Sequence, residues 1–130
     1  MCGIVGVLSQ HQAAPILVDA LRKLEYRGYD SAGIAVINNG TIQSKRALGK
    51  LIELNDILVY NPLIGKSGIG HTRWATHGAP SVKNAHPHST GTVSIVHNGI
   101  IENYKELKAE LCDIGYEFKS ETDTETVVAL

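Results

Sequence analysis

Two extended runs joined by an Asn-Gly pair constrain the fold more than any other feature of this sequence. They occupy residues 31–48, "SAGIAVINNGTIQSKRAL", and the joining pair is Asn39-Gly40. Asn-Gly favours the type I′ turn, whose twist matches that of two antiparallel strands. The sequence therefore predicts a tight β-hairpin here, and with it an antiparallel sheet.

Other strands and helices are interspersed along the chain. Apolar runs predict short strands over 2–9, 65–74 and 92–101, and helical spacing predicts helices over 14–26 and about 50–59. Tight hairpins combined with helices favour a largely antiparallel sheet with helices packed outside it. The fold class expected is therefore α+β.

Helical spacing also indicates which side chains enter the core. The first helix carries one apolar stripe, formed by Ile16, Leu17, Ala20, Leu21 and Leu24. A helix over 103–115 can be capped by Asn103 and stopped by Gly115. A last helix over 123–130 follows a capping-box pair, Thr122 and Glu125. No stop signal follows Leu130, so we expect the chain to be a fragment of a longer domain.

Composition limits the classes of function that need considering. The 130 residues suit one domain, and 43% of them are apolar, which is enough for a buried core. A net charge of −1 without a Lys/Arg block argues against nucleic-acid or membrane-surface partners. No apolar stretch approaches a membrane span, and no signal-peptide pattern is recognised. We therefore expect a cytoplasmic protein.

Several common site motifs are incomplete in this sequence. Gly65-Lys66-Ser67 lacks the earlier glycine of a phosphate loop, because position 60 is Tyr60. The six histidines lack the spacings of metal-binding motifs, so no metal site is expected. No glycine-rich motif opens a helix after a strand, so the sequence does not support dinucleotide binding either.

The two cysteines call for separate explanations. Cys112 continues a helical pattern with Leu107 and Leu111, which predicts a core-packing role. Cys2 instead lies next to Met1, and removal of that methionine would leave a thiol and a free α-amine on one residue. Reference pKa values of about 8.5 for thiols and about 7.7–8.0 for α-amines let the amine take the thiol proton. An N-terminal amine acting as base is a known route to an activated nucleophile, although a chance Met-Cys start remains open.

Six ordered motifs carry a resemblance to a known family. They are "MCGIVG", "YRGYDSAG", "GHTRWATHG", "NAHPH", "HNGIIEN" and "SETDTE". Together they resemble the N-terminal glutaminase domain of the glutamine–fructose-6-phosphate aminotransferase family, whose members are N-terminal-nucleophile amidotransferases. The resemblance runs over residues 1–130. It implies a four-layer αββα sandwich, incomplete at the C-terminal end, with no metal or organic cofactor.

The resemblance also implies catalytic roles for individual residues. Cys2 would attack the side-chain amide of L-glutamine, releasing ammonia and leaving a thioester that water hydrolyses to glutamate. The Asn98 side-chain amide and the Gly99 N–H would stabilise the oxyanion. On the residues alone, Asn98-Gly99 also fits a second hairpin turn.

The substrate and supporting residues are likewise implied by the resemblance. Arg73 would bind the α-carboxylate of glutamine and Asp123 its α-ammonium group. Trp74, Thr76 and His77 match the loop that covers the glutamine pocket. Arg27 and His86 match supporting residues around the nucleophile.

The family resemblance places this chain in a larger enzyme. Residues 1–130 would be the N-terminal portion of the glutaminase domain, without the sugar-phosphate isomerase domains that receive the ammonia. The full-length parent would be a homodimer. Two alternatives remain open: a glutaminase of the phosphoribosylpyrophosphate amidotransferase type, and a non-catalytic docking module that keeps the fold.

Overall fold

The computed structural model describes residues 2–75 and 78–130, apart from the side chain of Arg27. Its elements, in chain order, are β1 (Gly3–Leu8), α1 (Ala13–Arg22), a short helix η1 (Glu25–Arg27), β2 (Ser31–Asn38), β3 (Thr41–Leu48), α2 (Leu51–Tyr60), β4 (Ser67–Arg73), β5 (His88–Ser89), β6 (Ser94–Ile95), α3 (Tyr104–Asp113) and α4 (Thr124–Ala129). None of the helices in these ranges is long and apolar enough to cross a membrane.

A four-stranded antiparallel sheet has the order β1-β4-β2-β3. The predicted hairpin forms its β2–β3 edge. Asn39 and Gly40 have φ values of 51° and 77°, which are the two positive angles that a type I′ turn requires. The predicted hairpin is therefore confirmed, both by the conformation of its turn and by the antiparallel pairing of β2 with β3.

The register of this sheet gathers three strand ends at one place. Gly3 of β1 pairs with Thr72 of β4, and Ser31 of β2 pairs with Arg73 of β4. The start of β1, the end of β4 and the start of β2 thus lie together at one end of the sheet. Residues that flank these ends, including Cys2, are brought close although they are distant in sequence.

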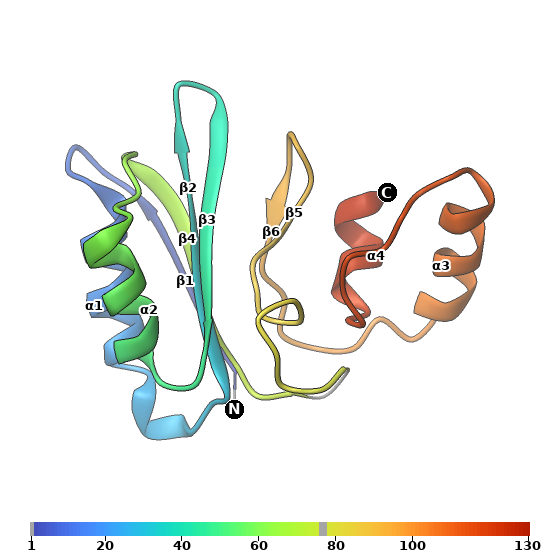
Figure 1. Ribbon diagram of the computed structural model, residues 1–130, viewed down its shortest axis with the longest axis horizontal. Coiled ribbons are helices and arrows are strands. Elements are labelled where there is room, and N and C mark those ends of the chain that lie inside the picture. Colours follow the sequence, from blue (N-terminus) through green and yellow to red (C-terminus); the bar gives the residue numbers. More distant parts are fainter. Residues whose placement is uncertain (1, 76–77) are drawn as a thin grey trace.

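The apolar core lies between the sheet and helices α1 and α2 (Figure 1). Leu17 and Leu21 are fully buried, as the helical spacing predicts. Ile16 was expected in the same stripe but is 37% exposed. The Ala13 N–H donates to the Gly65 carbonyl oxygen at 2.7 Å. The buried face of the helix is formed by Ala13, Ala14, Leu17, Val18 and Leu21, which leaves Ile16 at its margin.

The second half of the molecule completes a layered arrangement. Figure 1 shows α1 and α2, then the four-stranded sheet, then the β5–β6 pair, and finally α4 and α3. The layers therefore follow the helix–sheet–sheet–helix order, and the predicted α+β class is confirmed. The second sheet consists of two short antiparallel strands in the described residues.

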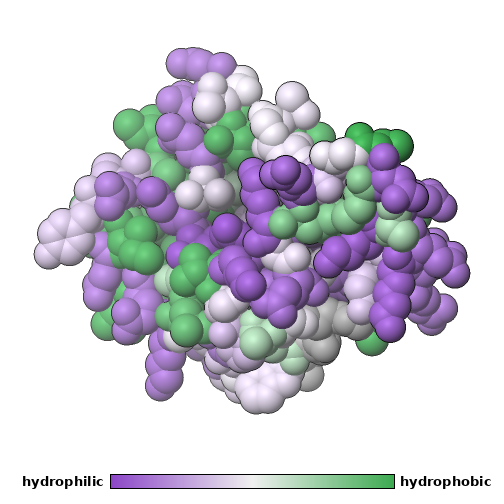
Figure 2. Space-filling model, turned by 45° about the vertical axis from the view of Figure 1, so that its right-hand side comes forward, coloured by the Kyte–Doolittle hydropathy of each residue, from purple (hydrophilic) through white to green (hydrophobic). Residues whose placement is uncertain are grey.

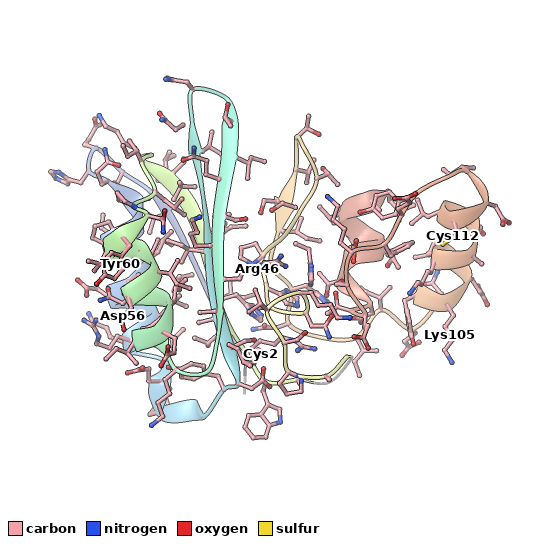
Figure 3. The ribbon with its side chains drawn as sticks, in the orientation of Figure 1. Cys2, Arg46, Asp56, Tyr60, Lys105 and Cys112 are labelled. Atoms are coloured by element: carbon pink, nitrogen blue, oxygen red, sulfur yellow. The ribbon has the colours of Figure 1, made fainter. Side chains whose placement is uncertain are left out.

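Close contact between the two halves depends on Gly33 in the middle of β2. A Cβ atom at Gly33 would lie 2.0 Å from the carbonyl oxygen of His86, so no larger residue fits without moving one layer. Arg46 spans the same junction from β3 (Figure 3), and its Nη1 donates to the carbonyl oxygens of Ala85 at 3.1 Å and Lys83 at 3.3 Å. These contacts hold the segment before β5 against the sheet.

The predicted strand over 92–101 is only partly formed. The strand pairing covers Ser94–Ile95, and Asn98-Gly99 forms no hairpin turn. The strand ends early because side chains, and not a neighbouring strand, accept hydrogen bonds from the backbone N–H groups that follow it. The His97 N–H donates to His86 Nδ1 at 3.3 Å, and the Ile101 N–H donates to Asp123 Oδ2 at 2.7 Å. Those donors are satisfied without a neighbouring strand.

Cys112 is exposed, so the core-packing prediction for it was wrong. Helix α3 buries only Leu111, and the adjacent position faces away from the contact. Figure 2 shows that polar residues dominate the face of the molecule that includes α3. Figure 3 shows Cys112 far from Cys2, and both thiols are free.

The predicted helix caps are also revised. Helix α4 covers Thr124–Ala129 within the predicted range of 123–130, but Asp123 is its N-cap residue, and Thr122 and Glu125 form no capping box. The Glu125 carboxylate instead accepts hydrogen bonds from the N–H groups of Lys119 and Ser120, each at 2.7 Å. Helix α3 begins after Asn103, as predicted, but the Asn103 side chain makes no capping hydrogen bond. Because these two N–H groups bind the Glu125 carboxylate, Glu125 does not cap its own helix.

Candidate active site

The sulfur of Cys2 lies at the end of the sheet where the strand ends gather. The Trp74 N–H donates to Sγ at 3.2 Å, and the thiol can donate to the Trp74 carbonyl oxygen at 3.5 Å. Cys2 is partly exposed. A backbone donor directed at the sulfur stabilises negative charge there, while exposure leaves the sulfur accessible to a reactant.

A cavity of about 240 Å³ opens beside this sulfur. That volume lies below the roughly 300–1,000 Å³ of drug-sized ligand sites, so the cavity suits a small metabolite. Six of the residues predicted from the sequence line it: Cys2, Arg73, Trp74, His86, Gly99 and Asp123. Residues as far apart in the chain as Cys2 and Asp123 are therefore gathered around one small space.

Opposite charges stand on the walls of the cavity. Arg73 and Asp123 are each only 3% exposed. Arg73 Nη2 donates to the Gly78 carbonyl oxygen at 3.1 Å. Asp123 Oδ2 accepts the hydrogen bond from Ile101 N–H, and Oδ1 lies 3.5 Å from the Thr124 hydroxyl. Protein contacts hold both groups in place, so the cavity offers a preformed cation and a preformed anion.

Asn98 and Gly99 lie beside Cys2. Asn98 Nδ2 donates to the Cys2 carbonyl oxygen at 3.3 Å. Gly99 has a φ of 141°, and a Cβ atom there would lie 3.1 Å from His97 Nε2. This backbone conformation suits glycine and excludes most side chains. The pair thus brings a side-chain amide and an unshielded backbone segment close to Cys2.

Three buried imidazoles, which we name the histidine cluster, adjoin the cavity: His71 and His86 line it, and His88 packs against His86. The His71 and His86 rings stack with centroids 4.2 Å apart, and the His86 and His88 rings meet edge to face at 4.7 Å. Burial, together with neighbouring cationic groups, lowers the pKa of His71 to about 4, of His86 to about 2 and of His88 to about 4. All three imidazoles are therefore neutral at pH 7.

Several residues near the site were not singled out from the sequence, among them His71, His97 and Asp30. Besides His71, Asp30 has a defined role: its Oδ2 accepts the Ala75 N–H at 2.5 Å, and its N–H donates to the Arg73 carbonyl oxygen at 2.7 Å. Asp30 thereby holds the chain where it leaves β4. Its place in "YRGYDSAG" was the available signal, since that motif was already prominent.

The remaining predicted residues have different outcomes. Trp74 lines the cavity but is 54% exposed, so it stands at the rim and not in the core. Thr76, His77 and Met1 lie outside the described residues, as does the side chain of Arg27. Within the described ranges, no group of three or more His, Cys, Asp or Glu side chains has an arrangement that could hold a metal ion.

Two larger hollows differ chemically from this cavity. One, of about 380 Å³, lies between α1 and α2, and the other, of about 650 Å³, lies where the two sheets diverge. Apolar side chains dominate both, and no described cysteine or histidine lines either one. The Cys2 cavity is thus distinguished by its reactive groups and not by its size.

Comparisons with known proteins agree with this geometry. The family described as "Glutamine amidotransferase domain" matches residues 60–130. The chain is 60% identical over its whole length to glutamine–fructose-6-phosphate aminotransferase [isomerizing] of Mesorhizobium japonicum, and 55% identical to the protein of that name in Caulobacter vibrioides. It covers 21% and 22% of those proteins, so the chain spans about a fifth of the length of these curated relatives.

Solved structures give the same result for the fold. Glutamine phosphoribosylpyrophosphate amidotransferase from B. subtilis matches the whole chain with a TM-score of 0.82 and 26% identity, over 29% of its own length. A structure described as the allosteric regulatory enzyme of purine biosynthesis also has a TM-score of 0.82, with 29% identity over 29% of its length. With a family match that covers more than half of its residues, this chain belongs to the glutamine amidotransferase domain family.

Proposed function

We propose that this chain hydrolyses L-glutamine to glutamate and ammonia, with Cys2 as the nucleophile. The observation that carries the proposal is the position of the Cys2 sulfur at a small cavity walled by a buried guanidinium and a buried carboxylate. Family membership supports it independently. The proposed reaction uses no metal or organic cofactor.

Substrate binding would use the two charged walls. Arg73 would bind the α-carboxylate of glutamine, since a guanidinium can form two parallel hydrogen bonds to a carboxylate. Asp123 would bind the α-ammonium group through the carboxylate lone pairs that the hydrogen bond from the Ile101 N–H does not use. Hydrogen bonds to charged groups contribute about 1.5–3 kcal/mol each. Together they would select a free amino acid over a glutamine within a peptide.

The proposed chemistry proceeds through a thioester. After removal of Met1, the α-amine of Cys2 would take the thiol proton, and the sulfur would form a bond to the side-chain carbonyl carbon. The carbon–nitrogen bond then breaks, and the amide nitrogen leaves as ammonia with the proton that the amine returns. Water attacks the thioester, which releases glutamate and restores the thiol.

The negative charge on the oxygen of each tetrahedral intermediate needs donors. We assign this role to the Asn98 side-chain amide and the Gly99 N–H, because Asn98 Nδ2 already lies against Cys2. Loss of one such donor typically lowers the rate by about 10²–10³. Trp74, Thr76 and His77 would cover the bound glutamine, and Arg27 and His86 would support the nucleophile.

The relatives suggest where the ammonia is used. Identity of 55–60% to glutamine–fructose-6-phosphate aminotransferases exceeds the 26% to the phosphoribosylpyrophosphate enzyme. We therefore propose that residues 1–130 are the N-terminal portion of a glutaminase domain in a cytoplasmic, homodimeric enzyme. Its isomerase domains would use the ammonia to convert fructose 6-phosphate to glucosamine 6-phosphate.

Substitution of the nucleophile tests the proposal in the full-length gene product. Cys2→Ala should abolish glutamate release from glutamine, whereas Cys112→Ala, at the exposed thiol on α3, should retain it. A glutamine-like electrophile should label Cys2 and spare Cys112. Unchanged turnover in Cys2→Ala would refute the proposed nucleophile. Equal labelling of both thiols would favour the docking-module alternative.

A further inference from the structure

His71 on β4 connects the histidine cluster to the proposed oxyanion site. It is fully buried, and its Nε2 lies 2.8 Å from Asn98 Oδ1. The other end of the same amide points to the nucleophile residue, because Asn98 Nδ2 donates to the Cys2 carbonyl oxygen at 3.3 Å. The Asn98 amide is therefore held at both ends by groups of fixed position.

The chemistry of these partners determines the position of one proton. A backbone carbonyl oxygen only accepts hydrogen bonds, so the NH₂ end of the amide must face Cys2. The oxygen end then faces His71, and an amide oxygen also only accepts. The imidazole must therefore donate from Nε2, which fixes the tautomer of His71.

We propose that His71 is a positioning residue: its Nε2–H holds the Asn98 amide so that the NH₂ group, and not the oxygen, faces the reacting centre. This inference rests on the proposed function of Asn98 as an oxyanion donor. With the amide turned over, its oxygen would face the developing negative charge and oppose it. The hydrogen bond from His71 to Asn98 Oδ1 prevents the amide from turning over, so its loss should lower the rate of the chemical step.

The surroundings of His71 maintain this arrangement. The stacked His86 ring, inclined by only 15°, fixes the plane of the His71 imidazole. His86 Nδ1 also accepts the N–H of His97, the residue before Asn98. Burial, with the Arg73 guanidinium nearby, lowers the pKa of His71 to about 4. At neutral pH the ring has one N–H, and the bond to Asn98 requires that proton.

The test compares three replacements of His71 in the full-length protein. His71→Met fills much of the same volume without a donor. His71→Gln can place an amide N–H near the Nε2 position, whereas His71→Asn is too short to reach it. Initial rates of glutamate release give kcat and KM for each variant, and thermal unfolding reports whether each variant is folded.

We expect kcat to fall in the variants that lack a hydrogen-bond donor at the Nε2 position of His71. His71→Met and His71→Asn should lower kcat by roughly 10- to 100-fold, which is part of the 10²–10³ that loss of an oxyanion donor costs. KM for glutamine should change by less than about threefold, because Arg73 and Asp123 are untouched. His71→Gln should recover most of the rate. If His71→Met does not fold, the Gln and Asn pair carries the same test.

A double-mutant cycle separates positioning from general structural support. In an Asn98→Ala background, His71→Asn should lower kcat by less than about threefold further, because the group that His71 positions is gone. An equal loss in both backgrounds, or wild-type kcat in His71→Asn, would overturn the inference. Failure of the proposed function is recognised separately, since it requires Cys2→Ala to retain glutaminase activity.

Discussion

Lowering the pH is a direct test of the histidine cluster. The unfolded chain binds protons at histidine with an ordinary pKa of 6.5, whereas His71, His86 and His88 have folded-state pKa values of about 4, 2 and 4. Below pH 6.5 the unfolded state therefore binds more protons than the folded state. The stability of the fold should decrease as the pH falls from about 6.5 toward 4.

The size of this effect follows from the same pKa values. At pH 5.5 each histidine is about nine-tenths protonated when unfolded and neutral when buried, which costs about 1.4 kcal/mol per residue. The three residues together should lower the free energy of unfolding by about 4 kcal/mol relative to pH 7.5. Domains of this kind have about 5–15 kcal/mol in total, so the loss is large.

Urea unfolding followed by circular dichroism at several pH values measures this free energy. Between pH 6 and 5 the slope should approach about three protons, or about 4 kcal/mol per pH unit. Replacing His88 by Gln should reduce the slope by about one proton, whereas His11→Gln, at an exposed position, should leave it unchanged. An unfolding free energy that is the same at pH 7.5 and pH 5.5 would refute this account of the cluster.

Two further predictions concern packing and the loop after β4. Gly33→Ala should destabilise the fold by about 1–3 kcal/mol or more through the clash with His86, whereas Gly6→Ala, where a Cβ meets nothing within 4 Å, should be tolerated in chemical denaturation. Asp30→Asn should weaken the charge-assisted hydrogen bond to Ala75 N–H and raise KM for glutamine with little change in unfolding temperature. An unchanged KM would show that this bond does not position the binding loop.

Features determined by local chemistry could be predicted from the sequence. The Asn39-Gly40 hairpin is one example, because two positive φ angles favour the same two residue types in any protein. Helices α1 and α2 and strand β4 also follow their apolar spacing. The family motifs were informative for a different reason: six separate segments matched one family in order.

Features determined by distant partners were harder to predict. Glu125 is paired with backbone N–H groups that precede its helix, and the 92–101 segment satisfies its donors through His86 and Asp123. Local patterns favoured a capping box and a strand. The link from His71 to Asn98 similarly joins residues 27 positions apart, and no spacing rule indicates such a buried pair.

Within the described residues, strand β1 lies at the edge of the sheet and pairs with β4 alone. Leu8 at its far end is 89% exposed and adds little to its hold. Backbone pairing therefore holds β1 from one side, and the contacts of Cys2 with Trp74 and Asn98 add to the hold on the sulfur. Detachment of β1 from β4 would move the thiol away from its cavity while β2, β3 and β4 stay paired. Inactivation and global denaturation are therefore separable events in this architecture.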